Sequence, residues 1–122
     1  MTDKVAIVCL TEPEDHARVL HAFEYAFNLQ NHGIKSEIFL DGAAVRIGDY
    51  LEKNPKDPAS VLIKQLYQKS IEQKYIREAC NFCAHAFSVK DEIIADNIPL
   101  SKDQVHIDIG KLVKEKYQII TI

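Results

Sequence analysis

The stretch VAIVCL, residues 5–10, decides the fold class of this 122-residue chain. It is nearly continuous in apolar residues and rich in β-branched ones, which is typical of a strand buried on both faces of a parallel sheet. A helix is expected next, with Pro13 as its first residue and Gly33 at its end. Its apolar positions recur at helical spacing and are Val19, Ala22, Phe23, Ala26 and Phe27.

The same alternation continues along the chain. Asp57 and Pro58 predict the cap and first residue of a helix that runs to about Gln73. Further strands are expected at residues 36–40, 74–80, 105–107 and 118–122, and further helices near residues 44–51, from about Cys83, after Ser88 and around residues 112–113. This order predicts an α/β domain spanning residues 1–122, with a mainly parallel sheet of about five strands and helices on both faces.

The composition is that of a globular protein. The formal net charge is −3, and the Lys and Arg residues are dispersed, so we expect no nucleic-acid partner. No apolar run reaches the length of a membrane span, and residues 1–4 lead into the first strand without a signal-peptide pattern, so we expect a cytoplasmic protein that does not bind membranes. Thiols stay reduced in the cytoplasm, so the three cysteines are expected to be free, reactive or metal-binding.

The segment CNFCAH, residues 80–85, carries the sharpest chemical signal. Ligands of open α/β sheets collect beyond the carboxyl ends of the strands, where this segment is expected to lie. A cysteine at the start of a helix meets unpaired backbone N–H groups, which stabilise the reactive thiolate. We therefore predict Cys83 and Cys80 as catalytic residues. The alternative is that both are inert cysteines of the core.

A zinc site is the other use of such a pair. Cys80, Cys83 and His85 supply three ligands, whereas a structural site usually takes four. His106 with Asp108 would complete a set only if the fold happened to bring them close. We therefore expect no metal and no cofactor.

Other residues are placed by the expected topology. Thr11 and Glu12 follow the first strand and Asp41 and Gly42 the second, so these four are candidate substrate-binding residues together with His85. Capping and turn formation would also explain them. Cys9 ends the first strand and is expected to be a packing residue. The remaining histidines lack a motif and are expected at the surface or in helix packing, namely His16, His21, His32 and His106.

Several segments in order resemble the DsrE/DsrF-like family of small sulfur-relay proteins. They are KVAIV near the start, the Pro-led first helix rich in Ala and Phe, Gly33, SEIFLDGAAV, ACNFCAHA and the closing QIITI. The resemblance covers essentially the whole chain. It implies a three-layer α/β/α fold, frequent oligomers, and a cysteine that carries sulfur as a persulfide. That cysteine is best matched by Cys83, which precedes small residues, and Cys80 matches the first cysteine of members with a CxxC pair.

Together with this resemblance, the cysteine pair predicts a sulfurtransferase-like carrier that moves sulfur as a persulfide between donor and acceptor proteins. The wide apolar stripe of the first helix and the habit of the family predict a homo-oligomer. Such exchange needs a thiolate and a leaving thiol, and no external cofactor. A non-catalytic, oligomeric binding domain for a small ligand or a protein is the alternative. A dithiol redox protein, which moves electrons only, is a third option.

Overall fold

The computed structural model describes residues 4–122 and contains one parallel sheet of four strands. The strands are β1 (Lys4–Cys9), β2 (Lys35–Leu40), β3 (Ile76–Ala79) and β4 (Gln118–Thr121), in the order β3-β2-β1-β4. Residues 1–3, part of the charged start on which the expected location rests, lie outside the described residues.

The expected fifth strand at residues 105–107 does not form. The chain instead makes a single parallel bridge from Leu100 to Ala79 of β3. The Ala79 N–H donates to the Pro99 carbonyl at 2.8 Å, and the Ser101 N–H donates to the Ala79 carbonyl at 2.9 Å. After that bridge the chain turns away, because the Ser101 hydroxyl holds the Val105 carbonyl in a tight loop. The sheet therefore has four strands rather than five.

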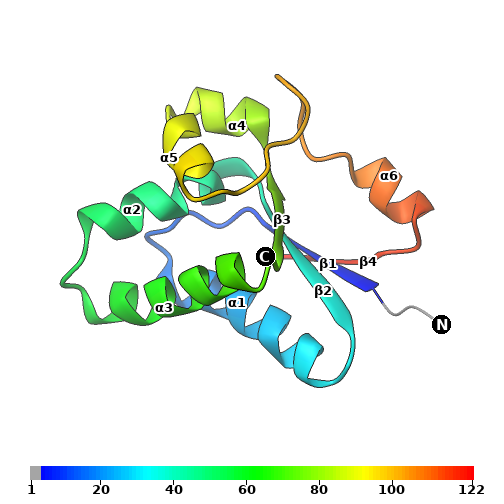
Figure 1. The fold of residues 1–122 in the computed structure, drawn as a ribbon, viewed down its shortest axis with the longest axis horizontal. Coiled ribbons are helices and arrows are strands. Elements are labelled where there is room, and N and C mark those ends of the chain that lie inside the picture. Colours follow the sequence, from blue (N-terminus) through cyan, green and yellow to red (C-terminus); the bar gives the residue numbers. More distant parts are fainter. Residues whose placement is uncertain (1–3) are drawn as a thin grey trace.

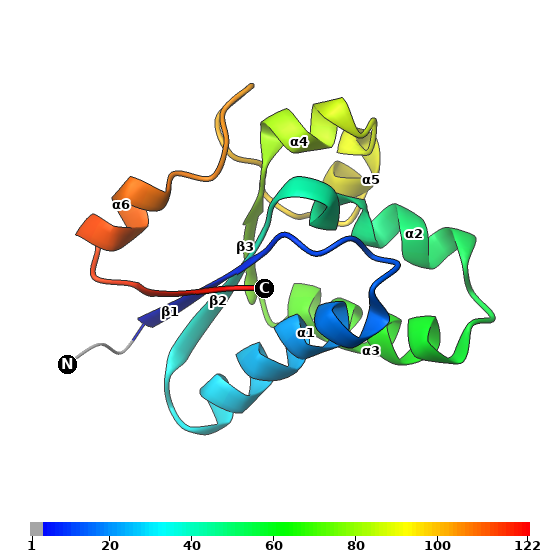
Figure 2. The ribbon, with the colours of Figure 1, turned by 180° about the vertical axis from the view of Figure 1, so that it is seen from behind.

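Within residues 4–122, seven helical segments surround the sheet in a three-layer α/β/α arrangement (Figures 1 and 2). They are α1 (His16–Asn31), the 3₁₀ helix η1 (Gly42–Arg46), α2 (Ile47–Lys53), α3 (Pro58–Glu72), α4 (Asn81–Ala86), α5 (Lys90–Ala95) and α6 (Ile109–Lys114). Among residues 4–122, no helix combines the length and apolar character needed to cross a lipid bilayer.

The two faces of the sheet contact different parts of the chain. The Ser36 hydroxyl donates to the Ala26 carbonyl of α1, so this face of β2 lies under α1. Side chains alternate along a strand, so Glu37 points to the opposite face, where Tyr117 and Arg77 donate to its carboxylate. Glu37 is a buried charge that is paired and hydrogen-bonded, as buried charges in proteins usually are.

The helix caps show where local sequence decides structure. α3 begins at Pro58 as expected, with the Asp57 carboxylate accepting from the Ala59 and Ser60 N–H groups. α1 does not begin at Pro13. It begins at His16, because Asp15 caps it by accepting from the Arg18 N–H, and Pro13 lies in the preceding turn.

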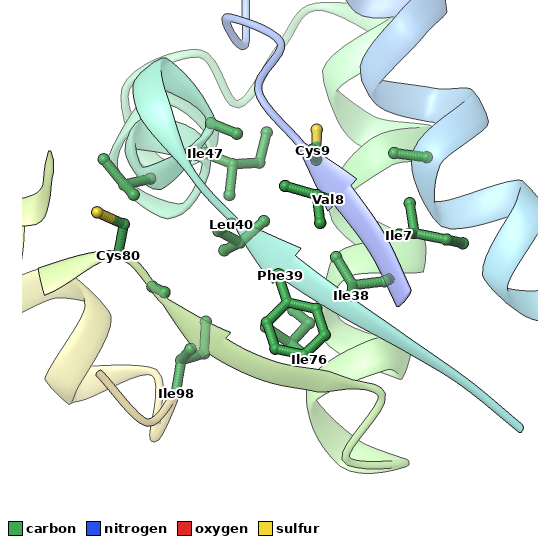
Figure 3. Close-up of a cluster of buried hydrophobic side chains, with 14 of the residues drawn as sticks. Ile7, Val8, Cys9, Ile38, Phe39, Leu40, Ile47, Ile76, Cys80 and Ile98 are labelled. Carbon is green, nitrogen blue, oxygen red and sulfur yellow. The ribbon is translucent and has the colours of Figure 1, made fainter. Parts of the chain in front are cut away.

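A β-bulge interrupts the pairing of β2 with β3. Ile38 pairs with Ile76, but Phe39 pairs with Glu78 and Leu40 with Ala79, so Arg77 is an extra residue on β3. Figure 3 shows Leu40 on β2, with Cys9 at the end of β1 and Cys80 at the end of β3. The carboxyl ends of β1, β2 and β3 therefore come level at one edge of the sheet.

Candidate functional site

The sheet register places Asp41 beside Cys80. Leu40 and Ala79 are paired, so the residues that follow them leave the sheet side by side. The Cys80 N–H donates to the Leu40 carbonyl at 2.8 Å, and the Asp41 N–H donates to the Cys9 carbonyl at 2.9 Å. Both backbones are therefore fixed by sheet hydrogen bonds.

The two cysteines are joined by the start of α4. Cys80 is the N-cap, and its sulfur accepts the Cys83 N–H at 3.3 Å. The Cys80 side chain is 0% exposed, whereas Cys83 is half-buried. The Cys83 thiol donates to the Asp41 carboxylate, with 3.7 Å between sulfur and oxygen. Cys83 is thus the thiol of this pair that solvent and partners can reach.

A distant loop brings a histidine to the same place. Asn81 donates its backbone N–H to the Ser101 hydroxyl at 2.8 Å and its side-chain amide to the Ser101 carbonyl at 3.0 Å. The Ser101 hydroxyl in turn donates to the Val105 carbonyl at 2.6 Å. These bonds hold His106 so that its Nδ1 lies 3.4 Å from the Cys80 sulfur.

The His106 ring is further positioned by an aromatic neighbour. The Phe82 ring centroid lies 4.6 Å from that of His106, at a tilt of 45°. Phe82 is 48% exposed, so this contact is at the surface of the site. Tilted aromatic pairs at such distances are attractive, and the contact restricts the imidazole.

Four residues thus converge, and we call them the edge cluster: Asp41, Cys80, Cys83 and His106. One side-chain oxygen, sulfur or nitrogen from each lies within 4.8 Å of those of the other three. They come from the ends of two strands, a helix and a loop, and are 65 residues apart at most in sequence. The arrangement combines a half-buried thiol, a buried thiol, an imidazole and a carboxylate.

Burial dominates the electrostatics of Cys80. It raises the pKa of this thiol to about 12, and the neighbouring Cys83 thiol and Asp41 charge act in the same direction. The N–H of Cys83 acts in the opposite direction but is outweighed. The start of the six-residue α4 therefore does not make Cys80 a thiolate at neutral pH, contrary to the expectation from the helix start alone.

No protein-family model and no curated protein matches the chain. The structure is similar to that of BT1422, a conserved protein of unknown function from Bacteroides thetaiotaomicron, with a TM-score of 0.64 and 25% sequence identity. The match covers 98% of this chain and 95% of that one. The same fold therefore extends over nearly the whole of both proteins.

The other predicted site residues lie apart from the edge cluster, except Gly42. The Gly42 N–H donates to the Asp41 carboxylate at 2.8 Å and so orients it. Thr11 and Glu12 line a separate open hollow of about 330 Å³ between the ends of β1 and α1. His85 lines another hollow of about 320 Å³, beside Ser88 and Lys90.

Cys9 is a buried packing residue, as expected. It is 2% exposed, and burial raises the pKa of its thiol. β2 separates β1 from β3, so Cys9 and Cys80 end strands that are not neighbours, and Cys9 lies outside the edge cluster.

The sequence reasoning placed His106 at the surface or in helix packing, whereas the structure brings it to Cys80. It also did not find Asn81 and Ser101, which hold the His106 loop. The sequence carries only a weak signal for Asn81 and Ser101. Asn81 lies between the two cysteines, and Ser101 follows Pro99 by two residues, where a loop was expected.

Proposed function

We propose that this protein is a cytoplasmic sulfur carrier that holds sulfur as a persulfide on Cys83. The single observation that carries the proposal is the pairing, at the carboxyl edge of a parallel sheet, of the reachable thiol of Cys83 with the buried sulfur of Cys80, which accepts the Cys83 backbone N–H. The resemblance of the sequence to DsrE/DsrF-like sulfur-relay proteins supports the same chemistry, and the fold agrees with the three layers that the resemblance implies.

The loading step is a thiol exchange at sulfur. The Cys83 thiolate attacks the outer sulfur of a donor persulfide R–S–SH, the donor S–S bond breaks, and R–S⁻ leaves. Cys83 then holds –S–SH. An acceptor thiolate attacks that outer sulfur in the same way, takes it, and regenerates the Cys83 thiolate. Both steps conserve electrons, so neither needs an oxidant.

Cys80 has a different part in this proposal. It stays a buried thiol at neutral pH, so it does not compete with Cys83 for the donor. When no acceptor arrives, it can attack the inner sulfur of the persulfide. The products are a Cys80–Cys83 disulfide and hydrogen sulfide, the proton of Cys80 leaving with the sulfide. Cys80 would thus limit the lifetime of the loaded state.

The test is the intact mass of the protein after incubation with a persulfide donor. The reduced, metal-free chain should gain one sulfur atom. Cys83→Ser should lose that gain, because a hydroxyl without an activating base is a poor nucleophile. Cys80→Ser should load and hold the sulfur longer. Cys9→Ala is the matched control, since it removes a buried sulfur away from the edge cluster, and it should load like the unchanged chain.

Other results would contradict the proposal. If Cys83→Ser still loads and Cys80→Ser does not, the roles of the two cysteines are reversed. If no variant with Cys83 gains sulfur, the carrier function fails and a non-catalytic binding domain takes its place. Formation of a disulfide in the unchanged chain, with no sulfur uptake by Cys80→Ser, would instead support the dithiol redox protein.

We also propose that the protein forms a homo-oligomer. The apolar stripe of α1 is used inside the chain, but β4 is an edge strand. A groove of about 560 Å³ lies beside it and is lined in part by His21, Tyr25 and Ile120. A second copy that covered this edge would pair its open backbone groups. Light scattering should give a mass well above 13.9 kDa, and a mass near that value at all concentrations would refute the oligomer.

A further inference from the structure

Two ligand pairs of the edge cluster have the spacing of a tetrahedral metal site. With zinc-to-ligand bonds of about 2.3 Å to sulfur and 2.0–2.2 Å to nitrogen or oxygen, neighbouring ligands of a tetrahedron lie about 3.6 Å apart. The Cys80 sulfur is 3.4 Å from His106 Nδ1, and the Cys83 sulfur is 3.7 Å from the Asp41 oxygen. These two pairs form opposite edges of such a tetrahedron, and every remaining separation is within 4.8 Å.

We propose that the edge cluster binds one zinc ion. Two thiolates, an imidazole and a carboxylate are the ligand types that zinc takes in proteins, and four of them close its coordination shell. Calcium and magnesium prefer oxygen ligands, and the cluster offers a single carboxylate. The earlier expectation of no metal depended on a missing fourth ligand. His106 and Asp41, rather than His85 and Asp108, supply the missing ligands.

The ligands are held before any ion arrives. Sheet hydrogen bonds fix the backbones of Asp41 and Cys80, and the Gly42 N–H orients the carboxylate. The Cys83 N–H already donates to the Cys80 sulfur. Such outer contacts orient ligands and strengthen metal binding in known sites. They leave only small movements for the ion to impose.

The exposure of the ligands also fits an exchangeable ion. Cys80 is fully buried, but Asp41 and Cys83 are half-buried and His106 is exposed. An ion can therefore enter from the solvent side and complete its shell against the buried sulfur. The metal site stands independently of the sulfur-carrier proposal. One consequence rests on that proposal: bound zinc occupies the Cys83 sulfur, so the zinc-bound protein should not accept sulfur.

The test uses the reduced, full-length chain freed of metal by a chelator. Cobalt(II) alone, added as a spectroscopic probe, should give the visible bands of a tetrahedral ion and a thiolate-to-metal charge-transfer band, saturating at one ion per chain. Zinc should displace it, with an apparent Kd tighter than about 1 µM, since structural zinc sites bind far more tightly than that.

Variants identify the ligands. His106→Gln and Asp41→Asn should each weaken zinc binding by about tenfold or more, the lower range seen even for residues that only orient ligands. His85→Gln is the matched control, a histidine near the pair but outside the cluster, and it should leave the affinity unchanged. All three positions are at least partly solvent-accessible, and circular dichroism checks that each variant folds.

Three results would overturn the site. They are zinc binding weaker than about 1 µM, octahedral cobalt spectra without charge transfer, and equal losses for His85→Gln and His106→Gln. Sulfur loading is measured separately on metal-free protein, so the two proposals fail independently. Loading without zinc binding refutes the metal site alone, and zinc binding without loading refutes the carrier alone.

Discussion

Cys80 should be almost unreactive toward iodoacetamide in the Cys83→Ser variant. Burial is the largest cause of its raised pKa of about 12. The variant keeps that burial but loses the two smaller raising effects of the Cys83 side chain, so a pKa of about 12 is the upper value for it and the ratios calculated from it are upper bounds. At about pH 7.5, a free cysteine with a pKa of about 8.5 is roughly one-tenth thiolate, whereas Cys80 would be thiolate in about 3 of 100,000 molecules. The ratio is about 3,000-fold.

The more basic thiolate is the better nucleophile, which offsets part of this ratio. With a Brønsted coefficient of about 0.45, a pKa difference of about 3.5 units makes the Cys80 thiolate roughly 40-fold more nucleophilic than that of free cysteine. The net expectation is alkylation about 80-fold slower than that of free cysteine, before burial slows the reagent further.

The assay follows the intact mass over time in Cys83→Ser, with Cys80→Ser as the partner variant and free cysteine as the reference. The rate for Cys80 should keep rising with pH through about pH 10, because its thiolate fraction is still small there. Alkylation of Cys80 within a few-fold of free cysteine, or a plateau below about pH 9, would show that burial does not control this thiol.

Three further predictions concern the support of the fold and the site. Tyr117→Phe should lower the free energy of unfolding by about 1.5–3 kcal/mol near neutral pH, because the Glu37 carboxylate, a charged acceptor, loses the hydrogen bond that the Tyr117 hydroxyl donates. Burial raises the pKa of Glu37, but the hydrogen bonds from Tyr117 and Arg77 outweigh burial, so the net shift is downward. This stability is therefore present above the unfolded pKa of about 4.3, and the difference in stability between the two chains in urea melts should shrink as the pH falls below that value. A difference that stays constant with pH would contradict the linkage. Ser101→Ala should cost about 1–3 kcal/mol in the same melts, since it removes the partner of the buried Asn81 N–H, and no loss would mean that the loop does not depend on this bond. Gly48→Ala should destabilise the fold by roughly 1–3 kcal/mol despite the helix preference of alanine, because the new Cβ would lie 2.7 Å from Asp96 Oδ2. Gly110→Ala is the control and should not destabilise the fold, because its Cβ would meet nothing closer than 3.7 Å.

The sequence predicted elements whose signals are local. The apolar run at residues 5–10 and the Asp57-Pro58 cap each contain within a few residues the physical reason for their structure. α1 begins at His16 rather than at Pro13 because the Asp15 carboxylate accepts the Arg18 N–H, and residue spacing alone does not reveal which residue caps the helix. The fold class followed from the repetition of such local signals.

The edge cluster could be predicted only in part. Cys80 and Cys83 were visible because their spacing is local, and Asp41 was visible because it follows an expected strand. His106 was not, since its position depends on Ser101 bonding back to Asn81 across 20 residues, with no repeating pattern to mark it. The burial of Cys80, which decides its chemistry, is likewise a property of the packed molecule and not of the motif.

The bulge at Arg77 governs more than the shape of β3. If β3 paired with β2 in a regular register, with no bulge, Leu40 would pair with Glu78. A carboxylate would then occupy the place of Ala79, which is 0% exposed. Cys80 would then lie one residue farther along, about 3.3 Å beyond Asp41, and the carboxylate and the two sulfurs would no longer converge. A single extra residue in a four-residue strand thus sets which residues lie side by side where β2 and β3 end. Its loss would part the Asp41 carboxylate from both cysteines while leaving all four residues of the edge cluster in the sequence.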